Sequence, residues 1–316
     1  LKKTSNVIVL DGVPHLFEKK RGVYSAITRF SDEMLMDNLP CMISQKVLCA
    51  NMVDVAKRFN AHKYSFPQES WLKNPQVERF IKFKNGVLDL KSGRIVETDN
   101  SKMEPYLLTH EIAAEYPEGG AECPLFDEYL ATSFAGVEDE IPLVLAMIGV
   151  AISNIRSLKK SFFIHGENDS GKSVLTRLLS GLVGEDYTSA LRLEDFGGKF
   201  DASALIGKFL NVGAEMTAGE FKNIAEFKAL NSGGSDLLDF KIKHKNSKMQ
   251  VNTALMVFPM NDLPSLPDDQ NIGSLFTRIQ IISMPNTIPA SERIQDLDFR
   301  LQSEYGAIAY KAVQVL

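Results

Sequence analysis

The sequence contains little of several features that would assign it to a particular class of protein. Its three cysteines, Cys41, Cys49 and Cys123, are odd in number and lack the spacing of metal ligands. We therefore expect reduced thiols and no disulfide framework. The longest apolar stretch, residues 141–152, is too short to cross a bilayer and predicts a core helix. With no secretory signal, repeat or low-complexity tract, the sequence predicts a cytoplasmic protein without a membrane partner.

Neither acidic nor basic residues are in large excess. The formal net charge is -5, with 24% charged and 44% hydrophobic residues. This composition excludes a broadly basic chain, so any nucleic-acid site must be a local basic patch. The apolar content is that of an ordinary globular protein with a large core. A length of 316 residues favours two or three domains.

Residues 160–184 carry the clearest chemical signal, in the sequence KSFFIHGENDSGKSVLTRLLSGLVG. Residues 161–165 are apolar and rich in strand formers, and residues 166–173 match G-x-x-x-x-G-K-[ST]. Residues 174–182 then place apolar side chains at helical spacing before Gly184. This order predicts a strand, a phosphate-binding loop and a helix. The alternative is a glycine-rich turn in a core.

The residue types of this loop fit a bound nucleoside triphosphate. Gly166 and Gly171 allow backbone N–H groups to turn toward phosphate oxygens, and the helix start adds its positive dipole end. Lys172 would reach the β- and γ-phosphates, facing solvent when no nucleotide is bound, and the Ser173 hydroxyl would bind Mg²⁺. The predicted ATP-binding residues are Gly166, Glu167, Asn168, Asp169, Ser170, Gly171, Lys172, Ser173 and Val174.

Two later apolar runs predict strands that deliver polar groups to the same site. Residues 209–215, FLNVGAE, end in Glu215, an acid placed to serve Mg²⁺ and the attacking water. A strand at residues 254–259 leads to Asn261, whose amide is suited to sensing the γ-phosphate. Arg278 follows, and its guanidinium could stabilise the transferred phosphoryl group, most usefully from a neighbouring subunit. The alternative for Arg278 is an internal ion pair that braces the last strand.

A basic hairpin is predicted between Glu215 and Asn261. Phe240 and Ile242 alternate with lysines, and a second strand returns after a turn near residues 245–247. Its predicted DNA-binding residues are Lys241, Lys243, His244, Lys245 and Lys248. A basic hairpin alone is usually a solvated tip or a protected sheet edge. Its place inside an ATPase core favours nucleic acid.

The rest of the chain predicts a smaller region of mixed structure. The predicted strands lie at residues 7–10, 13–17 and 23–27 and beside hairpin turns at residues 85–86 and 92–93. The predicted helices lie at residues 32–39, 47–59, 124–134 and 139–154. No residue pattern in the first 75 positions indicates catalysis.

The order of these motifs resembles that of the superfamily 3 helicases, within them the poxvirus and phage/plasmid primase-helicase branch. GENDSGKS is followed by Glu215, by Lys228 with GGSD at residues 233–236, by the basic hairpin, and by Asn261 and Arg278. The upstream stretch from FKNGVLDLKSGRI through CPLFDEYL to MIGVAISNIRSLKKSFFIHG resembles the N-terminal helicase-associated region of that branch. The resemblance covers about residues 80–316.

The resemblance implies an α/β AAA+ ATPase with a central parallel sheet. It implies a homo-hexameric ring that hydrolyses ATP with Mg²⁺ at subunit interfaces and moves single-stranded DNA during replication of a phage, virus, plasmid or mobile element. Lys172 and Ser173 would then hold phosphate and metal, Glu215 would orient water, Asn261 would be sensor 1 and Arg278 the finger in trans. Lys243 and His244 resemble the pair at the hairpin tip of some viral members.

The implied domains are a connecting or accessory region at residues 1–75, a helicase-associated domain at 76–155, the ATPase core at 156–290 and a C-terminal helical segment at 291–316. The sequence departs from many relatives at Ala214, where they have a second acid beside the one at Glu215. We expect a piece of a longer replication protein, with a fused or separate primase or polymerase. The alternatives are a AAA+ remodelling or packaging ATPase and a small-molecule P-loop kinase.

Overall fold

The computed structural model describes most of the chain. The described residues are 7–10, 13–18, 22–26, 65–66, 77–96, 110–196, 201–215, 221, 223–241, 247–265 and 272–316. The helices predicted at residues 32–39 and 47–59 lie outside them, as do Cys41 and Cys49. Cys123 is a buried free cysteine.

Five parallel strands form the central sheet, in the order β14-β8-β13-β10-β9. They are β8 (Ser161–Gly166), β9 (Thr188–Ser189), β10 (Leu210–Val212), β13 (Leu255–Met260) and β14 (Ile279–Met284). The chain crosses from β13 past β8 to β14, so the strand order reverses beside β8. In open α/β sheets a ligand binds at such a reversal, beyond the carboxyl ends of the strands. The predicted central parallel sheet is confirmed.

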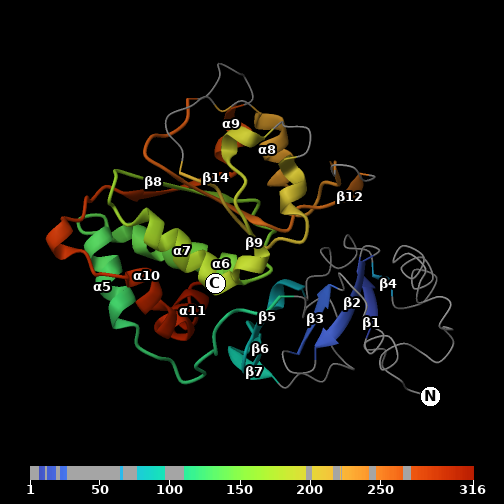
Figure 1. Ribbon diagram of the computed structural model, residues 1–316, viewed down its shortest axis with the longest axis horizontal. Coiled ribbons are helices and arrows are strands. Elements are labelled where there is room, and N and C mark those ends of the chain that lie inside the picture. The colour runs from blue at the N-terminus through green and yellow to red at the C-terminus, as the bar shows by residue number, and fades with distance from the viewer. Residues whose placement is uncertain are drawn as a thin grey trace.

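The strands are apolar on both faces, which is typical of a parallel sheet covered by helices on each side. Successive side chains of a strand point to opposite faces. On β13, Leu255 and Val257 therefore join one core cluster, and Met256, Phe258 and Met260 join the other. The result is a layer of helices on each face of the sheet (Figure 1).

Among the described residues, one group of helices packs on one face of the sheet and a smaller group on the other (Figure 1). The larger group is α5 (Pro124–Ser133), α6 (Ile141–Ile152), α7 (Lys172–Val183), α10 (Leu297–Arg300) and α11 (Tyr305–Val313). The smaller group is α8 (Ile224–Leu230) and α9 (Ile272–Phe276). The described 3-10 turns are Val77–Arg79, Glu138–Glu140, Glu185–Tyr187, Leu193–Asp195, Asp201–Leu205, Ala290–Glu292 and Leu301–Glu304. None of the described helices has the length and apolar character needed to span a bilayer.

Among the described residues, two small sheets precede the first helix. One has the order β3-β2-β1-β4 and the other β5-β6-β7. Their strands are β1 (Val7–Leu10), β2 (Val13–Glu18), β3 (Val23–Ala26), β4 (Ser65–Phe66), β5 (Phe80–Phe83), β6 (Gly86–Asp89) and β7 (Arg94–Val96). The strands predicted near the N-terminus and the two hairpin turns are confirmed. Val23 and Val87 form a small core of their own, which joins β3 to β6.

The small sheets connect to the central sheet through Glu78. Its carboxylate accepts hydrogen bonds from the backbone N–H groups of Arg156 and Ser157 at 3.2 and 3.1 Å. The Arg156 guanidinium in turn donates to five backbone carbonyls, those of Val150, Ser153, Ile155, Phe209 and Thr253. Burial lowers the pKa of Arg156 to about 10, so it stays charged at neutral pH. One side chain thereby gathers the end of α6 and the starts of β10 and β13.

Candidate active site

Residues 166–173 form the turn between β8 and α7, at the carboxyl edge of the sheet. Gly171 is the N-cap residue of α7 with a φ of 96°, and a Cβ there would lie 2.9 Å from the Ser133 hydroxyl oxygen. A Cβ at Gly166 would overlap the carbonyl oxygen of Met284 on β14. Both positions therefore require glycine. The predicted strand, loop and helix are confirmed, with Gly184 as the C-cap residue of α7.

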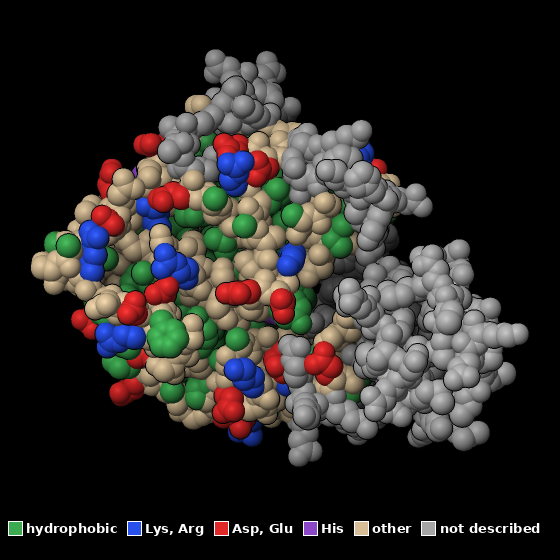
Figure 2. All heavy atoms as spheres, in the orientation of Figure 1, with side chains coloured by type: hydrophobic (Ala, Val, Ile, Leu, Met, Phe, Trp, Pro, Cys, Tyr) green, Lys and Arg blue, Asp and Glu red, His purple; other side chains and the backbone are tan. Residues whose placement is uncertain are grey.

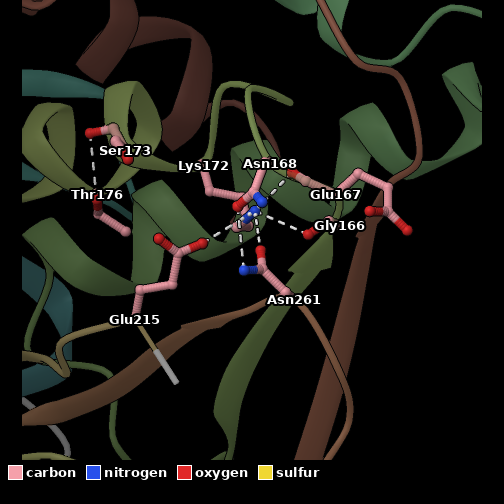
Figure 3. Close-up of polar contacts among 8 residues, drawn as sticks. All are labelled: Gly166, Glu167, Asn168, Lys172, Ser173, Thr176, Glu215 and Asn261. Carbon is pink, nitrogen blue, oxygen red and sulfur yellow. Dashed lines mark hydrogen bonds and ion pairs between the residues drawn. The ribbon is translucent and has the colours of Figure 1, made fainter. Parts of the chain in front are cut away.

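The ammonium group of Lys172 lies in a cluster of oxygen acceptors (Figure 3). Its Nζ donates to the carbonyl oxygens of Gly166 and Glu167 at 2.7 Å each and to Asn261 Oδ1 at 2.8 Å. Glu215 Oε1 lies 3.2 Å away and forms an ion pair with it. The lysine is only 4% exposed, so the expectation that it faces solvent without nucleotide is wrong. Four acceptors at the strand ends replace water around the ammonium group.

The strand order explains how Asn261 and Glu215 reach the lysine. Glu215 follows β10 and Asn261 follows β13, and β13 lies between β8 and β10. Because the strands are parallel, their carboxyl ends meet at one edge. Asn261 Nδ2 also donates to Asn168 Oδ1 of the loop at 3.2 Å, which orients the amide. Three of the four predicted catalytic residues therefore meet in one chain.

A cavity of about 650 Å³ opens beside this cluster. It is lined by residues 168–174 of the loop and by Glu215. The remaining lining residues are Tyr129, Thr132, Arg177, Ile288, Glu292, Arg293, Ile294 and Leu297. The volume lies in the usual range for small-molecule sites. These remaining residues were not predicted from the sequence, because they come from helices and an irregular segment that match no motif.

Helix α5 supports the loop from the protein interior. The Tyr129 hydroxyl donates to the carbonyl oxygen of Gly171 at 3.1 Å. Tyr129 is 2% exposed, and burial raises its pKa above the usual value, so the phenol remains a donor. The helix predicted at residues 124–134 is confirmed, but residue spacing alone does not show where a buried hydroxyl points.

The segment after β14 contacts the loop from the cavity side. The backbone N–H of Ile288 donates to the carbonyl oxygen of Asp169 at 3.1 Å. Arg293 Nη2 forms an ion pair of 2.9 Å with Asp169 Oδ2, and its Nε donates to the Ile288 carbonyl at 2.9 Å. Asp169 has a φ of 63°, in the left-handed region. These contacts hold an otherwise unfavourable loop conformation.

The residues at the cavity fit Mg²⁺ bound together with a nucleotide. Ser173 and Glu215 line the cavity, and 45% of the Glu215 side chain is exposed. Hydroxyl and carboxylate oxygens are ligands that Mg²⁺ prefers, and it usually keeps several waters and takes substrate phosphates as further ligands. Within the described ranges no three or more His, Cys, Asp or Glu residues are grouped as metal ligands. The donor set therefore suits a metal that arrives with its substrate.

Arg278 lies at the amino ends of the strands, opposite the edge that carries the loop. It precedes β14, whose first residue Ile279 pairs with Ser161 at the start of β8. The length of β8, about 17 Å at 3.3 Å per residue, separates this position from the loop. Arg278 Nη1 donates to the Ser274 carbonyl at 2.8 Å. Among the described residues it has no carboxylate partner, so the internal ion pair considered above is not present in that part of the chain.

The predicted basic hairpin has its two strands in place. β11 (Leu238–Phe240) and β12 (Lys248–Gln250) pair antiparallel. Lys241 is exposed just after β11. Lys243, His244 and Lys245 lie outside the described residues, so DNA binding at the hairpin stays a prediction. On the face shown in Figure 2, the acidic and basic side chains of the described part are interspersed, in line with the weak net charge.

Two family descriptions match separate parts of the chain. Residues 10–135 match the family described as "D5 N terminal like", and residues 164–278 match a family of unknown function, DUF5906. The first match ends just after α5, and the second extends from β8 to Arg278. It therefore includes the loop, Glu215 and Asn261.

The fold is similar to that of the C-terminal region of NrS-1, at 13% sequence identity in three apo structures. One A form structure has a TM-score of 0.54 and covers 97% of this chain and 65% of that chain. Another has a TM-score of 0.50 with coverage of 65% and 48%, and a further apo structure has 0.48 with 61% and 46%. This chain thus spans less than two thirds of each solved chain. The D5-like match covers residues 10–135, and the likeness to the NrS-1 region shows a shared fold.

Proposed function

We propose that this chain is the ATP-hydrolysing motor of a replicative DNA helicase with a AAA+-like core. One observation carries the proposal. Asn261 Oδ1 and Glu215 Oε1 lie 2.8 and 3.2 Å from Lys172 Nζ, beside a cavity at the start of α7. A lysine, an acid and a polar sensor around a phosphate loop are the groups that nucleoside triphosphate hydrolysis requires.

The contacts around Lys172 suggest how the site works. Phosphate oxygens would replace Glu215 and the loop carbonyls as partners of the ammonium, with further N–H donors from the loop and the start of α7. The released Glu215 carboxylate would orient a water molecule and take its proton as the water oxygen attacks the γ-phosphorus. The bond from the γ-phosphorus to the bridging oxygen breaks, which yields ADP and phosphate. Mg²⁺, held by Ser173 and Glu215, would neutralise phosphate charge when bound.

The distant Arg278 supports a ring arrangement. Its place at the far edge of the sheet keeps it from its own cavity, whereas a head-to-tail neighbour could bring that edge to the cavity of the next subunit. Repeating such a heterologous contact with a closing rotation produces a ring. We propose a homo-hexamer on this basis and on the resemblance described above.

Single-stranded DNA is the proposed partner of the hairpin formed by β11 and β12. Replacing both Lys243 and His244 by alanine should weaken oligonucleotide binding and flatten its dependence on salt, because fewer phosphate contacts release fewer counterions. The AAA+ remodelling or packaging ATPase and the small-molecule kinase remain the alternatives. Unchanged affinity and salt slope in the double variant would favour one of these.

The proposal is tested first by ATP binding and hydrolysis in two variants. Lys172→Ala should abolish hydrolysis, and Glu215→Gln should bind ATP but not turn it over. Because Lys172 is buried, its removal leaves acceptors unpaired at a cost of about 1–3 kcal/mol, so the melting temperature must be measured beside activity. Near-normal turnover by either folded variant would show that the site is elsewhere.

A further inference from the structure

Asp169 places a carboxylate in the loop that would receive a triphosphate. Its carboxylate is 55% exposed and lies among the residues that line the cavity. A carboxylate near phosphate groups is unfavourable because both carry negative charge. A cation beside Asp169 would offset this repulsion when a nucleotide is bound.

Arg293 is that cation in the structure, and it comes from the same chain. Its ion pair with Asp169 and its hydrogen bond to the Ile288 carbonyl are both 2.9 Å long. Ile288 itself is bonded to the Asp169 carbonyl. The guanidinium is therefore held by the loop through Asp169 and by its own segment through Ile288.

The guanidinium retains donors that these contacts do not use. It carries five N–H donors in a planar fork that matches phosphate oxygens. Among the described residues, Nε has Ile288 and Nη2 has Asp169 as partners, and Nη1 has none. Arg293 is 44% exposed and lines the same cavity as Lys172 and Ser173.

We propose that Arg293 is a second phosphate-binding cation of this cavity, positioned by Asp169. Nη1 binds a nucleotide phosphate oxygen while Nη2 stays on the carboxylate, so one guanidinium bridges the two negative groups. This inference rests on the proposed nucleotide-binding function. It differs from the role of Arg278, which lies at the other edge and would act on a neighbouring subunit.

The first measurement is nucleotide affinity by titration calorimetry, with adenosine added as a competitor. Arg293→Ala should weaken ATP binding roughly 10-fold to 100-fold, the range expected for a hydrogen bond to a charged group. Its affinity for adenosine should match that of the parent chain. Arg293→Lys should be intermediate, because a lysine keeps the charge but not the fork. An equal loss for adenosine would mean that Arg293 only shapes the cavity, and would overturn the proposal.

The second measurement repeats Arg293→Ala in an Asp169→Asn background. Asparagine tolerates the left-handed backbone, so the loop keeps its conformation while the carboxylate charge is removed. A phosphate-binding Arg293 predicts a further loss of ATP affinity in this background. If Arg293→Ala has no effect there, the guanidinium merely neutralises Asp169 and the proposal is wrong.

Arg192→Ala is the matched control. Arg192 is similarly exposed, at 49%, and pairs with Glu194 and Asp195 away from the cavity. Its ATP affinity should equal that of the parent chain. If the parent chain binds no ATP, or Lys172→Ala binds it normally, the proposed function and this inference both fail. If Lys172→Ala loses affinity and Arg293→Ala does not, only this inference fails.

Discussion

The two edges of the central sheet hold cations in different ways. At the carboxyl edge, Lys172 is buried and surrounded by oxygen atoms from the ends of three neighbouring strands. At the amino edge, Arg278 is partly exposed, and within the described part of the chain its side chain donates to the backbone carbonyl of Ser274. The first edge has its chemistry assembled in one chain. The second presents a cation that a second copy could use.

Replacing Arg278 at the amino edge should have the largest effect on ATP turnover. Arg278→Ala should lower ATP turnover by a factor of roughly 10³ to 10⁵ while ATP binding is retained, because an arginine supplied in trans acts mainly on the transition state. Mixing Arg278→Ala with Lys172→Ala should restore partial activity, since some interfaces then combine an intact loop with an intact arginine. Failure of mixing at every protein concentration, together with a lowered melting temperature, would assign Arg278 a structural role.

Replacing Asn261 changes the carboxyl edge without altering Arg278. Asn261→Ala removes the amide that contacts both Lys172 and Asn168 and should lower kcat about 10-fold to 100-fold, with a smaller change in ATP affinity. Asn261→Asp is the matched variant, because it keeps an acceptor for the lysine but loses the donor to Asn168. An unchanged kcat in both variants would remove Asn261 from the mechanism.

Stability at acid pH should depend on the pair of Arg79 and Asp89, which lies outside the central sheet. Arg79 hydrogen-bonds the buried Asp89 through two contacts of 2.6 Å and holds the pKa of that carboxyl at about 2, below the ordinary 3.8. The lowered pKa contributes about 2 kcal/mol of stability above pH 4, and this contribution is lost as the pH falls toward 2. Urea unfolding across this range should show a smaller pH dependence for Asp89→Asn than for the parent chain. Equal pH dependence in the two proteins would contradict the assignment.

Replacing Tyr129 should have the smallest effect, and it tests whether α5 positions the loop. Tyr129→Phe removes one hydrogen bond to the Gly171 carbonyl, worth about 1 kcal/mol, and keeps the buried ring. ATP affinity should fall about fivefold with kcat nearly unchanged, as expected for a residue that positions the loop. A fall in kcat at constant affinity would instead indicate contact with the reacting groups.

Local chemistry explains which parts of the site were predictable from sequence. The loop needs glycine at two crowded positions and an apolar strand before it, and both requirements are visible in residues 161–173. Glu215 and Asn261 follow apolar strands, so a parallel sheet places them at one edge. Their meeting point depends only on strand order.

The remaining features depend on packing that no short pattern encodes. The burial of Lys172 follows from where the Gly166 and Glu167 carbonyls point after the loop has folded. Tyr129 reaches the loop from a helix about 40 residues earlier, and Arg293 reaches it from an irregular segment about 120 residues later. Neither the periodicity of a helix nor the composition of a loop specifies such contacts.

Arg156 has a mechanical consequence for the hairpin. Thr253 lies between β12 and β13, and its carbonyl is bound by the same guanidinium that binds Phe209 before β10 and the end of α6. A force on the hairpin would be shared among several hydrogen bonds, because one planar guanidinium joins separate elements. The base of the hairpin would then move together with the central sheet. A lysine at position 156 could not reach the same carbonyls, and the base of the hairpin would move more independently of the sheet.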